Sequence, residues 1–288
     1  MKEKGMKNMN RFFDQPVEEV IEKRKSVRTY VENPLTPVDK AAIETYMDSL
    51  SNPFGVEVKF FFLEAEETGK SLGTYGVIKG TAHYIGAAVK EVPYALEALG
   101  YEMEKLMLFA ASRNIGTCWL GGTFKRGDFR KAMAIEEGML FPAITPIGCP
   151  KETRSMTDHL VRFIAKGNQR KPWTELFFYE EFTRLLSAEE AGIYGMPLEM
   201  VRLAPSASNK QPWRVLKKGD ALHFYEARSV GYSDAFPYDI QRLDLGIALC
   251  HFHLAAVERK LSGLMVLGYA PDTAVPDHYE YRFSWISD

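Results

Sequence analysis

Three cations and a hydroxyl group are concentrated at residues 24–28, where Arg24, Lys25, Ser26 and Arg28 lie between an expected helix and an extended segment. A phosphomonoester carries about two negative charges, and charge-assisted hydrogen bonds from guanidinium and ammonium groups hold it well. The cluster is therefore a candidate phosphate site. The alternative is a solvated basic helix end, which the helix dipole would favour without any ligand.

Two further segments combine small residues with groups that can face a ligand. Residues 205–212 begin and end with proline and carry two serines, an asparagine and a glutamine between them. Such a stiff loop can direct hydrogen-bonding groups at a planar heterocycle, and a plain solvent loop is the alternative. In residues 119–122 a tryptophan and a leucine precede two glycines, which let backbone N–H groups approach a ligand closely.

Familiar catalytic devices are missing from the sequence. Residues 68–71 end like a P-loop, but Glu64 stands where that motif requires glycine. No glycine-rich dinucleotide fingerprint and no Gly-x-Ser-x-Gly elbow occurs. His251 and His253 are two residues apart on an expected helix, so they point to different sides. We therefore expect no metal site and no catalytic side chain.

Composition limits the class of protein. The chain has 288 residues, is 46% hydrophobic and carries a net charge of -2, which excludes disorder as the main state. With 36 basic against 38 acidic residues, no nucleic-acid partner is expected, although local basic clusters stay possible. No signal-peptide or membrane-spanning stretch is visible, and three scattered cysteines form no disulfide framework. We expect a cytoplasmic protein that acts on a small molecule.

Hydrophobic spacing and turn residues predict alternating helices and strands, which is typical of an α+β fold. Helices are expected at residues 14–24, 36–52, 96–113, 129–133, 173–186, 196–203 and 242–260. Strands are expected at 27–30, 56–63, 117–120, 142–149, 213–216, 222–226, 263–269 and 279–285. Gly116 is expected to cap the third helix, and residues 64–80 and 151–172 to be largely irregular.

The two halves of the sequence resemble each other. Residues 109–121 match 254–268 as a helix end, a glycine and a short strand, and 43–52 match 198–207. A duplicated half-domain is the covalent equivalent of a two-fold dimer, and its binding site can lie between the halves. Chance similarity between α+β segments is the alternative.

The motifs together resemble those of the nitroreductase family of flavoproteins. Residues 24–30 are similar to the opening motif of that family, 204–213 to its second motif, and 101–122 to its later helix–glycine–strand segment. The second motif here follows the third, an order that, with the repeat, resembles the fused, internally duplicated branch. The resemblance implies a three-layer α+β fold, with a mixed, mainly antiparallel sheet and helices on both faces. The halves would be residues 14–172 and 173–288, forming one unit.

The resemblance also implies a non-covalently bound FMN held between the two halves. Arg24, Lys25 and Ser26 would hold the phosphate and ribityl chain, and Arg28 would approach the pyrimidine edge of the ring. The remaining residues implied to surround the cofactor are Leu120, Gly121, Gly122, Arg170, Lys171, Pro205, Ser206, Ser208, Asn209 and Gln211.

The implied activity is hydride transfer from NAD(P)H through FMN to a nitroaromatic, a quinone or a similar electron-poor acceptor. An FMN store or sensor without turnover, and a flavin-cleaving or dehalogenating enzyme of the same fold, stay open as alternatives. Aromatic residues such as Tyr75, Tyr84 and Phe236 are candidates for stacking on the acceptor or for the core. A monomeric pseudo-dimer is expected, and homodimerisation stays open.

Overall fold

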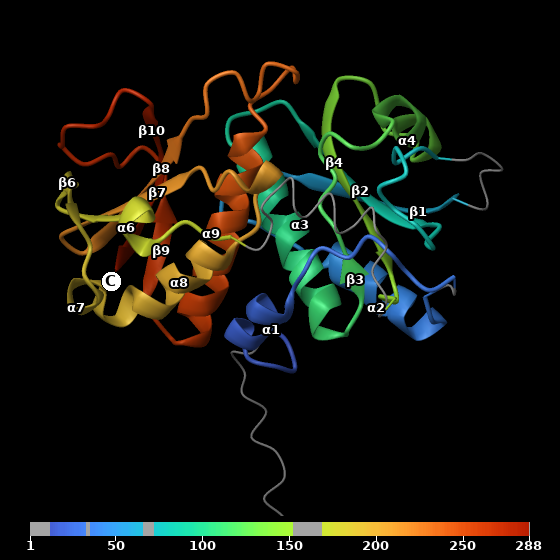
Figure 1. The fold of residues 1–288 in the computed structure, drawn as a ribbon, viewed down its shortest axis with the longest axis horizontal. Coiled ribbons are helices and arrows are strands. Elements are labelled where there is room, and N and C mark those ends of the chain that lie inside the picture. Colours follow the sequence, from blue (N-terminus) through green and yellow to red (C-terminus); the bar gives the residue numbers. More distant parts are fainter. Residues whose placement is uncertain (1–11, 33–34, 66–71, 152–168, 288) are drawn as a thin grey trace, which may run out of the picture.

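The computed structural model describes residues 12–32, 35–65, 72–151 and 169–287, which form a mixed α+β fold (Figure 1). The P-loop-like stretch at 68–71 lies outside the described residues, as do residues 152–168 of the segment expected to be irregular. No helix within the described ranges is long and apolar enough to cross a membrane.

The first sheet has four antiparallel strands in the order β1-β2-β4-β3. They are β1 (Val58–Glu64), β2 (His83–Lys90), β3 (Gly116–Thr117) and β4 (Met139–Gly148). Helices cover both faces of this sheet. Val89 of β2 packs in one cluster with residues of α3 (Ala95–Ser112), whereas Tyr84 packs edge-on against Phe129 of α4 (Arg126–Ala132).

The second sheet has the strand order β6-β5-β7-β8-β10-β9, and all its pairs are antiparallel except β5–β7. Its strands are β5 (Phe177–Tyr179), β6 (Glu181–Leu185), β7 (Trp213–Lys218), β8 (Ala221–Ala227), β9 (Gly263–Val266) and β10 (Tyr279–Ser287). Helix α9 (Gln241–Glu258) covers one face, where Phe252 packs edge-on against Phe224 and Trp285. The α+β class is therefore confirmed, with the strands divided between two sheets.

The shorter helices connect these layers. They are α1 (Val17–Lys23), α2 (Pro37–Asp48), α6 (Trp173–Leu176), α7 (Ala188–Ala191), α8 (Gly195–Leu203) and the 3₁₀ turns η2 (Gly192–Tyr194) and η3 (Ala207–Asn209). The start of α2 agrees with the sequence, because Thr36 accepts a hydrogen bond from the Asp39 backbone N–H and Pro37 opens the helix. Helix α1 contacts α3, α8 and α9, so it spans both halves.

The repeat predicted from the sequence is visible in the topology. The order β1-β2-β4-β3 recurs as β7-β8-β10-β9, with α3 and α9 at equivalent places before β3 and β9. The division at residues 172 and 173 stays a prediction, because α1 packs on helices of both halves.

One strand was not predicted, and two local expectations were wrong. Strand β2 was not expected, because it is buried on both faces and shows no polar–apolar alternation. The helix expected at 173–186 ends at Leu176, because Phe177 is extended and residues 177–179 pair with β7; Glu180, with a left-handed φ of 62°, then turns the chain into the β5–β6 hairpin. Gly116 lies in β3, not at a helix cap, and a Cβ there would lie 2.9 Å from Val27.

Helices α3 and α9 lie side by side between the two sheets (Figure 1). A Cβ added to Gly100 would lie 2.2 Å from the Leu243 carbonyl oxygen, and one added to Gly246 would lie 1.9 Å from the Glu97 carbonyl oxygen. Real Cβ atoms do not approach backbone oxygens so closely. The two glycines therefore allow the helix backbones to touch, and no larger residue fits without moving the helices apart.

We expect Gly246→Ala to destabilise the protein by about 3 kcal/mol, the upper range for overpacking, because backbone atoms must move. Gly127→Ala is the matched control: Gly127 lies in α4, and an added Cβ there meets nothing within 4 Å. That control should be neutral or slightly stabilising. Urea unfolding measures the free energy of unfolding of the two variants. Equal values for both would contradict the conclusion that Gly246 lets α3 and α9 touch.

Candidate functional site

A cavity of about 790 Å³ lies between the halves, and most of the predicted site residues line it. This volume is in the range of small-molecule and cofactor sites. All of the predicted cofactor residues except Lys171 and Gln211 line it: Arg24, Lys25, Ser26, Arg28, Leu120, Gly121, Gly122, Arg170, Pro205, Ser206, Ser208 and Asn209. Segments far apart in sequence therefore share one site.

The cationic side of the cavity is built on Arg24, at the end of α1. Its side chain is only 5% exposed, and its Nε lies 3.4 Å from Glu104 Oε1. Neither Nε nor Nη1 has a hydrogen-bond acceptor among the described residues, although both atoms are buried. A buried guanidinium with unsatisfied donors is costly unless an acceptor binds to it. This wall therefore fits an anionic ligand.

Arg170 faces the same region from the segment just before the boundary between the halves. Its guanidinium donates to the Leu203 carbonyl oxygen and, from Nη1 at 3.1 Å, to Asn209 Oδ1. Burial, and then the nearby charge of Arg24, lower the pKa of Arg170 to about 10. Two guanidinium groups that repel each other would both be stabilised by an anion bound beside them.

The loop after α8 forms the second wall in a strained conformation. Ser208, Asn209 and Gln211 all have positive φ, at 46°, 56° and 50°. A non-glycine residue in this region costs about 1–2 kcal/mol. Hydrogen bonds hold the loop: Ser206 Oγ accepts from the Gln211 backbone N–H at 2.8 Å, and Asp244 Oδ1 accepts from the Ala207 N–H at 3.0 Å. Such strain is typical of a functional site.

Two predicted cofactor residues lie behind this wall and do not line the cavity. The Gln211 side chain is buried and accepts a hydrogen bond from the Lys171 backbone N–H at 2.7 Å. It also donates to the Asn209 carbonyl oxygen at 3.1 Å. In this structure both residues support the loop.

The Gly-Gly segment forms the wall contributed by the first half. Leu120 bridges to Ile144, and the Gly121 carbonyl oxygen accepts from Arg126 Nη2 at 2.6 Å. A Cβ on Gly121 would lie 2.9 Å from Ile240 Cδ1, so glycine lets α9 approach. The backbone of residues 120–122 is thereby held at the cavity surface.

Comparison with known proteins decides the family. A family model described as "Putative TM nitroreductase" matches residues 16–256. The chain belongs to this family. No curated protein matched the sequence.

Solved structures include similar folds. A "putative nitroreductase" from Thermotoga maritima is 23% identical, with 99% of each chain covered and a TM-score of 0.61. A nitroreductase family protein from Clostridium novyi is 21% identical over 50% of this chain and 91% of its own, with a TM-score of 0.40. A nitroreductase with bound FMN from Desulfitobacterium hafniense is 16% identical over 48% of this chain and 90% of its own, also at 0.40.

In this nitroreductase-family chain, the segment between β8 and α9 places two aromatic rings at the cavity, Tyr232 and Phe236. Tyr232 donates to Ser208 Oγ at 2.8 Å, and Phe236 lies next to Gly122. Of the three aromatic candidates from the sequence, only Phe236 lines the cavity, since Tyr84 is in the core and Tyr75 is exposed.

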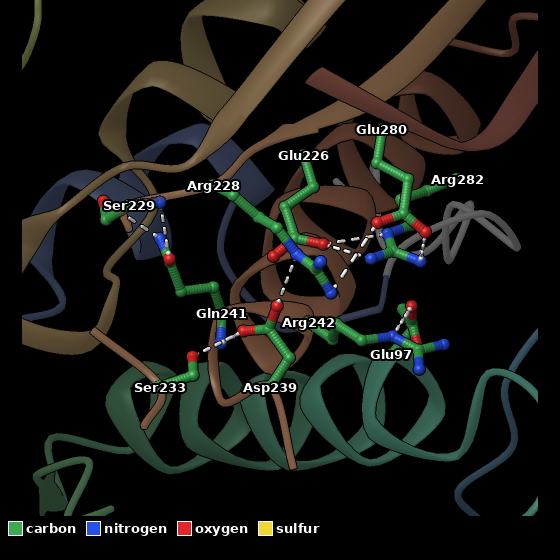
Figure 2. Close-up of polar contacts among 10 residues, drawn as sticks. All are labelled: Glu97, Glu226, Arg228, Ser229, Ser233, Asp239, Gln241, Arg242, Glu280 and Arg282. Atoms are coloured by element: carbon green, nitrogen blue, oxygen red, sulfur yellow. Dashed lines mark hydrogen bonds and ion pairs between the residues drawn. The ribbon is translucent and has the colours of Figure 1, made fainter. Parts of the chain in front are cut away.

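A polar network fixes the base of this aromatic segment (Figure 2). Asp239 accepts from Ser233 Oγ at 2.6 Å and from Arg228 Nε at 3.0 Å. Beside it, Arg282 donates to the buried Glu226. Arg242 of α9 donates to the buried Glu97 of α3 at 2.8 Å, so a second contact joins the halves here.

The sequence did not indicate Asp244, which lines the cavity from α9. An acidic residue in the first turn of a helix has an ordinary explanation in the helix dipole. In the structure it is 2% exposed, and its Oδ2 has no hydrogen-bond partner within the described ranges. Burial raises its pKa well above the usual value, and the nearby Glu226 and Asp239 add to the effect. A protonated Asp244 adds no negative charge to a cavity that fits an anion.

We expect Asp244→Asn to become more favourable relative to wild type as the pH rises. The unfolded chain releases the Asp244 proton above pH about 4, while the folded protein retains it, so wild-type stability falls with pH. The asparagine variant has no proton to release at this position, so its stability does not fall in this way. Its side-chain oxygen can still accept the hydrogen bond from the Ala207 N–H. Between pH 5 and 7 the difference in unfolding free energy should grow by about 2.7 kcal/mol, which is about 1.36 kcal/mol per pH unit for one proton.

Denaturant unfolding under identical cofactor conditions measures this difference. Asp48→Asn, which removes an exposed carboxylate of α2, is the control. A wild-type-to-Asp244→Asn difference that is the same at both pH values would show that Asp244 is ionised in the fold.

Proposed function

We propose that this chain is an FMN-dependent oxidoreductase of the nitroreductase type. It would use NAD(P)H to reduce an electron-poor acceptor such as a nitroaromatic or a quinone. When bound, FMN supplies the two-electron redox chemistry, and the protein supplies binding, orientation and electrostatics. The observation that carries this proposal is Arg24, whose buried Nε and Nη1 have no hydrogen-bond acceptor in the part of the chain that the structure describes. It lies beside the half-buried guanidinium of Arg170 in a cavity of cofactor size.

In this proposal each wall of the cavity contacts a different part of FMN. Arg24, Lys25, Ser26 and Arg170 hold the phosphate and the adjoining chain, because they form the cationic end of the cavity. Arg28 approaches the pyrimidine edge of the ring. The strained loop and the backbone of residues 120–122 contact the ring from opposite halves. Family membership supports this arrangement.

The electron acceptor would bind beside the two aromatic rings that line the cavity. Tyr232 and Phe236 present ring faces or edges there, which favours a planar aromatic molecule. Their positions are held by the Asp239 network (Figure 2) and by the Tyr232–Ser208 hydrogen bond.

Arg24→Ala should weaken FMN binding about 10- to 150-fold, because one charge-assisted contact to the phosphate is lost. Riboflavin, which has no phosphate, should bind the variant and the wild type almost equally. Arg184→Ala, which removes an exposed arginine paired with Glu190, is the control. Fluorescence titration measures all these affinities, and unchanged FMN affinity in Arg24→Ala would overturn the assignment of the phosphate site.

Turnover separates the proposed enzyme from its alternatives. Steady-state NAD(P)H oxidation with nitroaromatic and quinone acceptors is the expected result. Tight FMN binding without NAD(P)H oxidation would instead indicate a flavin store or sensor. Parallel assays under oxygen and under nitrogen would reveal a flavin-cleaving or dehalogenating activity.

One FMN per chain is expected, although the fold contains two similar halves. The first-half loop that corresponds to 205–211 carries Phe54, which stacks on Tyr94 at 5.7 Å and packs edge-on against Phe283 at 5.7 Å. Asn52 of the same loop donates to the Val56 carbonyl oxygen at 2.7 Å. Aromatic rings thus fill the region where this loop would face a ligand.

Released FMN measured against protein concentration, with the molecular mass in solution, gives the ratio. A ratio near one is expected for the purified, FMN-saturated chain. A ratio near two would show that the pairing of the halves is wrong.

A further inference from the structure

A buried carboxylate joins two walls of the cavity from behind. Glu104 of α3 is fully buried, and its Oε2 accepts a hydrogen bond from Trp119 Nε1 at 2.6 Å. Its Oε1 lies 3.4 Å from Arg24 Nε and 3.0 Å from His251 Nε2. Arg24 and Trp119 both line the cavity, whereas Glu104 and His251 do not. Glu104 therefore contacts two cavity residues without reaching the cavity itself.

The surroundings of His251 define its protonation state. Its Nδ1 lies 2.9 Å from the Met200 carbonyl oxygen, and its Nε2 faces Glu104 Oε1. A carbonyl oxygen and a carboxylate oxygen are both acceptors, and a neutral imidazole has only one N–H to donate. When Glu104 is ionised, both contacts are satisfied together only by an imidazolium.

Glu104 must be ionised for this arrangement to hold. Burial by itself would raise the pKa of Glu104, but Arg24, His251 and Trp119 together keep it below the usual value. Trp119 and Arg24 can only donate, so a carboxylate suits both. The adjacent Cys250 thiol is buried, which raises its pKa and keeps it uncharged.

We propose that Glu104 and a doubly protonated His251 form a buried ion pair that positions Arg24 and Trp119 at the cofactor cavity. This inference rests on the proposed function. The pair also connects the two halves: Arg24 follows α1, Glu104 lies in α3, His251 lies in α9, and Met200 lies in α8 just before the strained loop. Glu104 is thus a positioning residue that acts through Arg24.

The net charge of these three side chains distinguishes a positioning role of Glu104 from a simple electrostatic effect on FMN binding. Arg24, Glu104 and His251 together carry one net positive charge in the wild type. In Glu104→Gln the carboxylate is lost, and His251 should also lose its second proton because its ionised partner is gone. The net charge beside the phosphate site is then unchanged, so altered binding reports the position of Arg24.

Glu104→Gln should lower FMN affinity about tenfold, the scale of one misplaced charged contact, with less than a twofold change for riboflavin. Glu102→Gln is the matched control: it changes a buried carboxylate two residues away that bonds Asn52, without contacting Arg24 or Trp119. It should leave the FMN-to-riboflavin affinity ratio unaltered. In an Arg24→Ala background, Glu104→Gln should have no further effect on that ratio.

The second readout is the ¹⁵N NMR signal of the His251 ring in the full-length protein. Two protonated nitrogens are expected in the wild type at neutral pH, and a neutral tautomer in Glu104→Gln. A neutral His251 in the wild type would overturn the proposal without any variant having to fold. An unchanged FMN-to-riboflavin ratio in Glu104→Gln, or an equal extra loss in the Arg24→Ala background, would overturn it too.

These outcomes also differ from a failure of the proposed function. If the wild type bound no FMN, the function would be wrong, while the His251 signal would still report the ion pair. If FMN bound and Arg24→Ala weakened it, but Glu104→Gln did not, only the positioning role would be wrong.

Discussion

Helices α3 and α9 touch backbone to backbone, because Gly100 meets the Leu243 carbonyl and Gly246 meets the Glu97 carbonyl. The cavity depends on this contact. Its walls come from segments at the ends of these helices and from α1, which rests on both of them. The Val17 backbone N–H donates to Glu258 of α9, which ties the start of α1 to the second half. Any side chain at the crossing would separate the walls that must meet around one ligand.

The charged residues near the contact between α3 and α9 place an excess of cations at one end of the cavity. Glu104 balances part of the charge of Arg24 and His251, whereas Arg170 donates hydrogen bonds to the Leu203 carbonyl oxygen and to the Asn209 amide oxygen. Burial raises the pKa of Asp244, the acid that accepts a hydrogen bond from the loop, well above its usual value. A phosphate beside Arg24 would therefore meet two guanidinium groups, and the carboxylates that line the cavity are the buried Asp244 and the exposed Glu22. Since buried charges are stable only when paired, the cavity favours an anionic ligand over a neutral one.

The residues packed around the cavity also stabilise the loop at residues 205–212, whose backbone angles are unfavourable by themselves. Three left-handed residues within 208–211 cost roughly 1–2 kcal/mol each. Hydrogen bonds offset that cost: Arg170 and Lys171, which are adjacent in sequence, donate to the loop, and Asp244 of α9 accepts from it. Gln211 and Lys171, which the sequence suggested as ligands, act here on the shape of the loop.

The sequence by itself determined much of this protein. Hydrophobic spacing located α3 and α9, and the capping residues of α2 could be recognised from their types. The basic cluster, the proline-bounded loop and the Gly-Gly pair marked much of the cavity wall. These features are local: each depends on residues within one or two turns of the chain. The repeat was also readable, because the two halves keep similar helix–glycine–strand segments.

Only the tertiary structure decided which buried groups serve the site. Glu104, Asp244 and His251 look in sequence like ordinary helix residues, and their roles arise from partners on other elements. Strand β2 and the β5–β6 hairpin were missed for a related reason. Burial on both faces of β2 removes the alternation, and pairing with β7 keeps residues 177–179 extended within a helical pattern. Long-range packing sets the dielectric, the hydrogen-bond partners and the allowed backbone angles at these positions, and none of these is encoded in spacing along the chain.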